Sequence, residues 1–242
     1  MTAIWGHRGA CGYAPENTLP SFELAVQQGA DGVEFDVQLS KDGALVVIHD
    51  ERLERTTGGS GWVKDHTLAQ LQRLDASGGK RGFHAYIPTL AEVLAILTPT
   101  DLRINVELKT SVVDYPGIEE KVLEQIEIYA LEPRIVLSSF NHYSLRRLMK
   151  LGTTCEIATL FTDPIYKPWA YAAEFGAAAF HPWVGHVRSK AFVSKSHAAG
   201  VAVRPWIVNS KKDLRRMFKW EVDAVFTDVP DIARSILPVR TS

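Results

Sequence analysis

The sequence predicts an α/β fold, a (β/α)₈ TIM barrel with a small insertion after its second strand, and three observations support this. Short apolar runs alternate with longer amphipathic segments throughout the 242 residues. Near-continuous apolar runs are typical of parallel strands buried on both faces. Eight strand–helix pairs are present, which is the number that closes such a barrel. A barrel of this kind commonly fills about 250 residues as one domain, so residues 1–242 are expected to form one domain.

The expected elements follow the alternation in chain order. The strands are expected at 3–8, 32–39, 103–109, 134–140, 155–161, 177–181, 201–208 and 222–227. The helices are expected near 17–28, 89–97, 116–130, 142–151, 168–175, 189–199, 210–219 and 230–237. Asn17 or Thr18 is expected to cap the first helix. An open doubly wound sheet fits less well, because no G-x-G-x-x-G motif follows the first strand.

A ninth apolar run, residues 44–49, does not fit the alternation. It follows Asp42-Gly43, a dipeptide that favours the two-residue type I′ turn of a hairpin. We therefore expect it to return antiparallel to strand 33–39. With this turn Lys41 pairs with Ala44, and Asp36 faces His49 on the same side of the ribbon.

Residues 50–88 form a long polar and glycine-rich segment, with one helical stretch near 67–74. Loops of this length in compact domains are usually functional or disordered. We expect the segment to be an insertion over the C-terminal mouth of the barrel.

The composition is that of a soluble globular protein and excludes several classes. Hydrophobic residues make up 46%, and 27 Lys and Arg stand against 28 Asp and Glu. This excludes intrinsic disorder and disfavours a nucleic-acid partner. No apolar run is long enough for a transmembrane helix, and residues 1–8 show no secretory signal. The two cysteines, Cys11 and Cys155, lie too far apart to predict a disulfide framework or a zinc site, and they suit a cytoplasmic location.

Three carboxylates stand in or at the end of apolar strands, where the active sites of barrels lie. Glu34 and Asp36 are two residues apart, so they point to one face of their strand. Glu107 ends the next barrel strand. Carboxylates without thiolates favour a hard divalent cation, Mg²⁺ or Ca²⁺. The alternative is salt bridging to Arg8 and Lys109, but the cost of unpaired buried charge favours the metal.

Two histidines, His7 and His49, are expected near the same mouth and suit a general acid and base pair. Arg8 and Lys109 suit an anionic group such as phosphate. Neither a G-x-S-x-G elbow nor a P-loop is present, so phosphoryl chemistry is favoured over acyl transfer and nucleotide triphosphate hydrolysis. A structural role is expected for the remaining histidines, with His181, at the end of the sixth strand, as the exception: His66, His84, His142, His186 and His197.

An ordered series of motifs covers essentially the whole chain and resembles the glycerophosphodiester phosphodiesterases, in particular the bacterial cytoplasmic type. The motifs are His7-Arg8-Gly9, Pro15-Glu16-Asn17-Thr18, Gly29-Ala30-Asp31, Glu34-x-Asp36-Val37, Lys41-Asp42-Gly43, His49-Asp50, Ile87-Pro88-Thr89-Leu90, Val106-Glu107-Leu108-Lys109, Ser138-Ser139-Phe140, Trp206-x-x-Asn209 and Phe226-Thr227-Asp228-x-Pro230.

The resemblance implies a TIM barrel with a small inserted subdomain that hydrolyses glycerophosphodiesters to sn-glycerol 3-phosphate and an alcohol. It implies that a divalent metal is bound by three residues, Glu34, Asp36 and Glu107. His7 would be the base and His49 the acid, although the sequence does not fix this order, nor whether water or the glycerol 2-hydroxyl attacks first. Arg8 and Lys109 would contact phosphate. His181 and Trp206 would line the glycerol or alcohol end.

There are three alternatives: a lysophospholipase D, a phosphatidylinositol-type phospholipase C, and a non-enzymatic barrel that binds glycerophosphodiesters. Two titratable histidines argue against mere binding. The sequence shows no exposed, Trp-rich basic helix of the kind that docks on a membrane, so stable membrane association is not expected. The basic segment 211–219 is interpreted as a solvated helix face. The head group, the choice between Mg²⁺ and Ca²⁺, and a homo-oligomeric state are left open.

Overall fold

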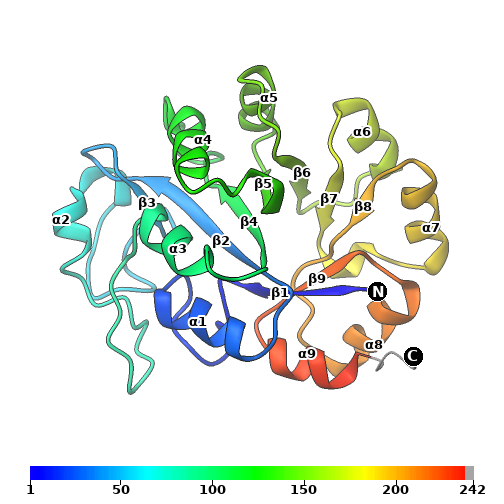
Figure 1. Cartoon of the computed structure of the whole chain (residues 1–242), viewed down its shortest axis with the longest axis horizontal. Coiled ribbons are helices and arrows are strands. Elements are labelled where there is room, and N and C mark those ends of the chain that lie inside the picture. Colours follow the sequence, from blue (N-terminus) through cyan, green and yellow to red (C-terminus); the bar gives the residue numbers. More distant parts are fainter. Residues whose placement is uncertain (238–242) are drawn as a thin grey trace.

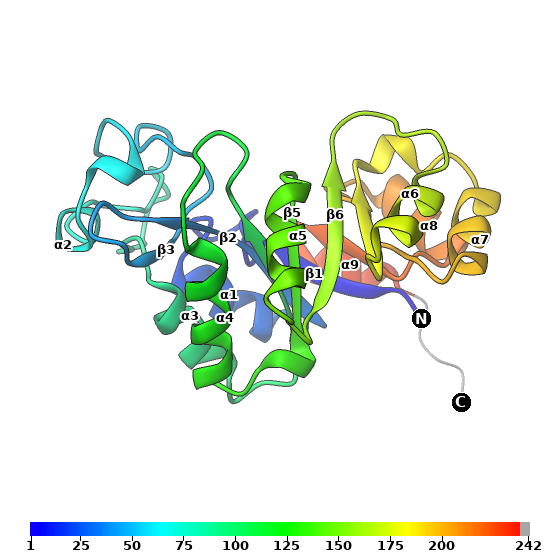
Figure 2. The same cartoon turned by 90° about the horizontal axis from the view of Figure 1, so that it is seen from above.

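The computed structural model describes residues 1–237 and shows a barrel of parallel strands surrounded by helices (Figures 1 and 2). Within these residues, eight strands are joined in the order β8-β7-β6-β5-β4-β2-β1-β9, and β3 lies outside this order and pairs with β2. The strands are β1 Ala3–His7, β2 Gly32–Leu39, β3 Leu45–Val47, β4 Arg103–Leu108, β5 Ile135–Ser139, β6 Glu156–Phe161, β7 Ala179–Pro182, β8 Ala202–Val203 and β9 Ala224–Thr227. The predicted fold class is confirmed.

The helices lie outside the barrel and follow the predicted segments closely. They are α1 Leu19–Gln27, α2 Leu68–Leu71, α3 Leu90–Leu97, α4 Ile118–Ile128, α5 His142–Lys150, α6 Pro168–Phe175, α7 Lys190–Ala198, α8 Lys211–Trp220 and α9 Pro230–Ile236, with short 3₁₀ turns at Val63–Asp65, Glu132–Arg134 and Val184–His186. Helix α8 buries Leu214, Met217 and Phe218, and the spacing of these residues gives it one apolar face. Four of its five basic residues are exposed, as the prediction of a solvated face requires: Lys211, Lys212, Arg215 and Lys219.

The barrel closes between the first and last strands and between β8 and β9. β1 pairs with β9 in a register that sets Gly6 against Thr227. β8 is shorter than the predicted strand 201–208, because Pro205 has no N–H to continue the ladder. Three backbone hydrogen bonds complete the closure: Asp223 N to Val203 O, Phe226 N to Pro205 O, and Val208 N to Phe226 O.

The N-terminal end of the barrel interior is filled by apolar and paired side chains. Trp5 packs edge-on against Phe226, with ring centroids 5.3 Å apart, and the Arg204 guanidinium lies over Trp5. Glu156 forms ion pairs with both Arg103 and Arg204. This end is therefore closed by packed side chains, and the cavity lies at the opposite end, where the strands finish.

The predicted hairpin forms, but its predicted register is wrong. Val37 pairs with Val47 and Leu39 with Leu45. The connection has one more residue than a type I′ turn. Ser40 N donates to Ala44 O, and Ala44 N donates to Ser40 Oγ, so the loop is Lys41–Gly43 with Gly43 at φ +77°. A three-residue loop with a left-handed third residue is the next most common hairpin form.

This shift places Asp36 opposite Ile48 rather than His49, with Ile48 N donating to Asp36 O. His49 lies just past the ladder. Its position is fixed by the buried Gln38, whose Nε2 donates to the carbonyls of Ile48, His49 and Asp50 at 3.0, 3.1 and 2.9 Å. The chain therefore curls toward the barrel at the histidine.

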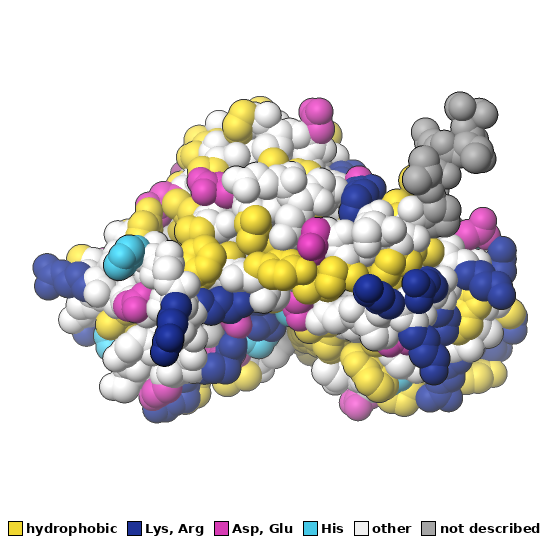
Figure 3. Space-filling model, turned by 90° about the horizontal axis from the view of Figure 1, so that it is seen from below, with side chains coloured by type: hydrophobic (Ala, Val, Ile, Leu, Met, Phe, Trp, Pro, Cys, Tyr) yellow, Lys and Arg dark blue, Asp and Glu magenta, His cyan; other side chains and the backbone are white. Residues whose placement is uncertain are grey.

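Residues 50–88 follow β3 as an insertion beyond the C-terminal end of β2, on one side of the barrel (Figure 2). The insertion and the end of β3 share a small apolar core: Val46, Ile48, Leu53, Val63, Leu71, Ala76 and Ile87. In Figure 3 the outline is hollowed between this lobe and the opposite lobe of the barrel. Among the described residues, no helix has both the length and the apolarity that crossing a membrane requires.

Candidate active site

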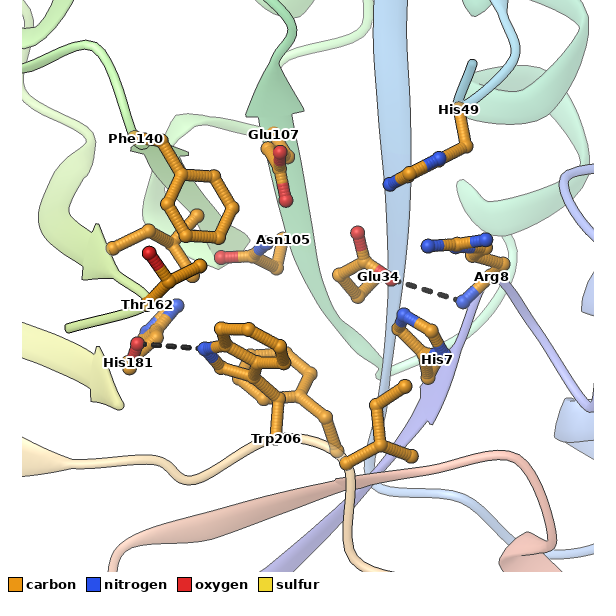
Figure 4. A pocket seen from close by; sticks show the side chains of 13 residues that line it. His7, Arg8, Glu34, His49, Asn105, Glu107, Phe140, Thr162, His181 and Trp206 are labelled. Carbon is orange, nitrogen blue, oxygen red and sulfur yellow. Dashed lines mark hydrogen bonds between the residues drawn. The ribbon is translucent and has the colours of Figure 1, made fainter. Parts of the chain in front are cut away.

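A cavity of about 290 Å³ lies at the C-terminal ends of the barrel strands (Figure 4). Seven of the predicted site residues line it: His7, Arg8, Glu34, His49, Glu107, His181 and Trp206. The remaining two lie beside it and contact these residues. Asp36 is buried next to Arg8, and Lys109 Nζ is 3.2 Å from Glu107 Oε1. The structure thus brings all nine predicted residues to one place.

Three carboxylates converge from two neighbouring strands. The register of β2 on β4 sets Asp36 directly against Glu107. Glu34, two residues before Asp36, shares its face of the strand. All three residues are buried, and they can offer oxygens that lie within 4.8 Å of one another. Asp36 Oδ2 accepts a hydrogen bond from Asn17 Nδ2 at 2.9 Å, while Asp36 Oδ1 has no hydrogen-bond partner.

The charges of this acidic triad (Glu34, Asp36 and Glu107) are not balanced by the protein alone. Burial raises the pKa of Glu34 well above its usual value, and Asp36 and Glu107 raise it further. Burial also raises the pKa of Glu107 to about 7, although Lys109 opposes the change. Burial opposes ionisation of Asp36 too, but His49, Arg8 and Lys109 outweigh it and lower its pKa to about 2.

The acidic triad fits a hard divalent cation. Carboxyl groups that retain protons because they repel one another are stabilised as carboxylates by a cation between them. Oxygen ligands are those that Mg²⁺ and Ca²⁺ prefer, and the unpartnered Asp36 Oδ1 supplies a free acceptor. These residues are therefore suited to hold a divalent metal.

His7 is oriented by Asp228, which follows the last strand. Because Gly6 pairs with Thr227, the next residues along β1 and β9 come together, and His7 Nδ1 is 2.7 Å from Asp228 Oδ1. Burial opposes ionisation of Asp228, but its bonds to His7 lower its pKa to about 2, so it stays a carboxylate. A carboxylate accepts, so Nδ1 carries the ring proton and Nε2 is left as the basic nitrogen.

His49 is oriented in the same way by its neighbour. Its Nδ1 is 2.6 Å from Asp50 Oδ1, and Arg55 from the insertion clamps both oxygens of Asp50 at 2.6 and 2.8 Å. Arg55 also donates hydrogen bonds to both carboxylate oxygens of Glu16, and Glu16 accepts a further hydrogen bond from Arg8 Nη1 at 2.7 Å. A continuous network therefore joins His49, through Arg55 of the insertion and Glu16, to Arg8.

The cations of the site stay charged. The pKa of Arg8 is raised, since burial is outweighed by Asp36, Glu16 and Glu34. The pKa of Lys109 is raised because Glu107 and Asp36 outweigh its burial. Lys109 Nζ also lies 3.3 Å from His49 Nε2. Both cations are thus available to an anionic ligand.

His181 lies deeper in the barrel than the other predicted residues. It is fully buried, and burial with the nearby Arg204 lowers its pKa well below the usual value, which keeps the ring neutral. Its carbonyl accepts from Trp206 Nε1 at 2.8 Å, and its Nδ1 has no hydrogen-bond partner. It can hydrogen-bond to a neutral group but cannot serve as a cation.

Several residues that contact the site were given no role in it from the sequence, and Asn105 and Asp228 are the clearest cases. Asn105 lines the cavity beside Glu34, with its Oδ1 unpartnered, and its place two residues before Glu107 is a signal for the shared face. Asp228 was noted only within a motif, although barrel closure alone places it next to His7. Asn17 was expected to cap α1 but bonds to Asp36. Thr18, at the N-cap position, donates instead to Pro15 O.

Comparisons with known proteins agree with this geometry. Residues 7–232 match the model of the glycerophosphoryl diester phosphodiesterase family. A glycerophosphodiester phosphodiesterase of Bacillus altitudinis is 47% identical over 240 residues, covering 98% of both chains. One from Caldanaerobacter subterraneus is 43% identical and covers 95% of both chains.

Solved structures show the same fold. A phosphodiesterase from Oleispira antarctica, in complex with the product sn-glycerol-3-phosphate, is 31% identical with a TM-score of 0.85 and covers 98% of this chain and 96% of its own. A glycerophosphodiester phosphodiesterase from Agrobacterium tumefaciens is 30% identical with a TM-score of 0.86, covering 97% of this chain and all of the other. The chain belongs to the glycerophosphoryl diester phosphodiesterase family.

Proposed function

We propose that this protein hydrolyses glycerophosphodiesters to sn-glycerol 3-phosphate and an alcohol, with a divalent metal, Mg²⁺ or Ca²⁺, held by Glu34, Asp36 and Glu107. The observation that carries the proposal is the arrangement of the cavity. Two histidines, each held by a carboxylate through Nδ1, flank the buried acidic triad. Histidines in these positions can accept a proton on one side of an anionic phosphate and donate a proton on the other.

The cationic side chains bind the phosphate, and the two histidines transfer protons. Arg8 and Lys109 contact the phosphate oxygens and offset the charge that develops in the transition state. A bound divalent metal supplies Lewis-acid stabilisation of the same phosphate. His7 accepts a proton at Nε2 from the attacking hydroxyl, while Asp228 stabilises the resulting imidazolium. His49, protonated at both ring nitrogens and held by Asp50 at Nδ1, donates the Nε2 proton to the leaving alkoxide, which otherwise leaves poorly at neutral pH.

The cavity favours a small diester. Its wall opposite the histidines is apolar and includes Phe140, Leu160, Trp206 and Phe226. We propose that this wall, with His181 at its base, receives the carbon skeleton of the glycerol or alcohol. A volume of about 290 Å³ lies at the small end of ligand pockets, so long acyl chains would extend outside it. This supports a glycerophosphodiester over a phosphatidylinositol lipid.

We further propose that residues 1–242 act as one catalytic domain and that insertion 50–88 serves the site. The insertion contributes Arg55, which holds Asp50 behind His49. It also contributes Lys80, whose Nζ donates at 2.6 Å to the carbonyl of Cys11, four residues after His7.

The test is release of glycerol 3-phosphate from glycerophosphocholine, measured by a coupled assay. EDTA should abolish release, and Mg²⁺ or Ca²⁺ should restore it. His7→Ala and His49→Ala should each lower kcat by at least about 10²-fold, the usual worth of general acid–base catalysis. The control is His84→Ala, because His84 is exposed in the insertion. Full activity after chelation would remove the metal role, and faster hydrolysis of a lysophospholipid would favour lysophospholipase D.

A further inference from the structure

A second group of metal-ligating side chains lies behind His7, separate from the acidic triad. Cys11 Sγ is 3.0 Å from Asp228 Oδ1 and 3.9 Å from His7 Nδ1, and His7 Nδ1 is 2.7 Å from the same carboxylate oxygen. The three side chains are each partly exposed. The proposed hydrolysis uses His7 and Asp228 but gives Cys11 no role.

The three atoms are spaced as ligands of one ion. A triangle with sides of 2.7, 3.0 and 3.9 Å has a circumscribed radius of about 2 Å, so one point lies about 2 Å from all three atoms. Zinc binds imidazole nitrogen and carboxylate oxygen at roughly 2.0–2.2 Å and thiolate sulfur at about 2.3 Å. An ion slightly out of this plane would lie close to all three ligand distances.

The chemistry of the donors selects a different cation from the acidic triad. An imidazole, a thiolate and a carboxylate suit Zn²⁺ and similar thiophilic ions, whereas Mg²⁺ and Ca²⁺ require oxygen ligands. Two anionic ligands also balance the charge of a divalent ion. The partly exposed position leaves room for water as a fourth ligand.

The proposed ligands and the loop that carries Cys11 are also held by hydrogen bonds from neighbouring groups, as in many metal sites. Asn209 Nδ2 donates to Asp228 Oδ2 at 2.5 Å, and Gly12 N donates to the Asp228 carbonyl at 2.8 Å. Lys80 Nζ holds the Cys11 carbonyl. These contacts fix the carboxylate and the loop that carries the thiol, so little ordering remains to oppose binding.

We propose that His7, Cys11 and Asp228 form an inhibitory site for Zn²⁺ or a cation of the same class. Binding replaces the thiol proton of Cys11, which is released to water. Coordination of Nδ1 leaves the single imidazole proton of His7 on Nε2. A protonated Nε2 cannot accept the proton of the attacking hydroxyl, so the zinc-bound enzyme is inactive. The inhibition rests on the proposed function of His7, whereas the binding does not.

The test uses the full chain with excess Mg²⁺ and adds Co²⁺ as a spectroscopic probe. Thiolate ligation of Co²⁺ gives a charge-transfer absorption in the near ultraviolet, and Zn²⁺ added afterwards should remove it. The band should be present in the wild type and lost in Cys11→Ser and Cys11→Ala, with circular dichroism used to check folding. Cys155→Ser is the matched control, because Cys155 is the other free cysteine and is buried elsewhere.

Inhibition is measured in parallel, against each variant's own zinc-free rate. The zinc concentration for half-inhibition should rise at least about 10-fold in Cys11→Ser, because loss of a ligand costs at least as much as loss of an outer-shell partner. A band that is absent from the wild type, or survives both Cys11 substitutions, overturns the site. Equal inhibition of wild type and Cys11→Ser overturns its inhibitory role. A wild type that binds Co²⁺ through Cys11 but hydrolyses no diester refutes the proposed function and leaves the metal site standing.

Discussion

Asp228→Asn tests whether the orientation of His7 carries the chemistry, because it removes one charge and changes no shape. In the wild type both oxygens of Asp228 accept hydrogen bonds, Oδ1 from His7 and Cys11, and Oδ2 from Asn209. An asparagine side chain has one accepting and one donating end. One of these neighbours must therefore face an N–H group.

Asn209 cannot relieve the conflict by turning over. Its Oδ1 accepts from Asp228 N at 2.9 Å and from Thr227 Oγ1 at 3.1 Å, and a flipped amide loses both bonds. The variant amide is therefore expected to keep its oxygen toward Asn209 and to turn its NH₂ toward His7. His7 then accepts at Nδ1 and carries its proton on Nε2, which is the wrong tautomer for a base.

The expected loss is in kcat. The same substitution behind the histidine of a Ser-His-Asp triad lowers kcat about 10⁴-fold, so we expect about 10³- to 10⁴-fold here, or roughly 4–5.5 kcal/mol of transition-state stabilisation. KM and the Mg²⁺ concentration for half-activation should change by less than about 3-fold, because Asp228 contacts neither the acidic triad nor substrate.

The assay is steady-state release of glycerol 3-phosphate at saturating Mg²⁺. Asp231→Asn is the matched control, since Asp231 lies three residues away and accepts only an exposed bond from Tyr13. It should retain wild-type kcat. A kcat of Asp228→Asn within about 10-fold of wild type, in a folded protein, would refute the tautomer argument.

Two further predictions concern the insertion and the acidic triad. Arg55→Ala removes the clamp on Asp50 and should lower kcat roughly 10-fold through misplacement of His49. Arg52→Ala, which loses an exposed pair with Glu54 and a contact over the Trp62 ring but nothing that holds Asp50, should not, and equal rates of the two variants would contradict the network. In metal-free protein, burial and Asp36 raise the pKa of Glu107 to about 7 against the effect of Lys109, from an ordinary 4.5. The folded state then binds more protons than the unfolded state between these values, so stability is fully present below about pH 4.5 and is lost as pH rises through 7. The melting temperature in EDTA should fall over this range, and Glu107→Gln, but not the exposed Glu124→Gln, should reduce the fall; equal falls in both variants would contradict the assignment.

The barrel and most of the site follow from local patterns in the sequence. Near-continuous apolar runs, in which polar residues do not alternate with apolar ones, predict parallel strands that are buried on both faces. The two-residue period of a strand places Glu34 and Asp36 together, and the shared edge of parallel strands adds Glu107. These rules depend only on neighbouring residues in the chain and neighbouring strands in the sheet, so they can be applied without knowledge of side-chain contacts.

The hairpin register was decided by side chains that the turn rule ignores. Asp42-Gly43 is a good two-residue turn, but Asp42 Oδ1 accepts from Ser40 Oγ and from Leu68 N at the start of α2. Ser40 Oγ in turn accepts from Ala44 N. These bonds favour the longer loop. His49 reaches the site because Gln38 curls the chain after the ladder ends.

The sequence by itself determined the architecture, the acidic triad and the presence of two histidines with two cations. Only the tertiary structure decided what holds each histidine. Asp228 lies 221 positions from His7, and they meet because the first and last strands of a closed barrel are neighbours. Closure also brings the carboxylate to the thiol of Cys11. The spacing of these residues along the chain does not predict that Asp228 contacts His7 and Cys11, because the contact is set by the register of strands from opposite ends of the sequence.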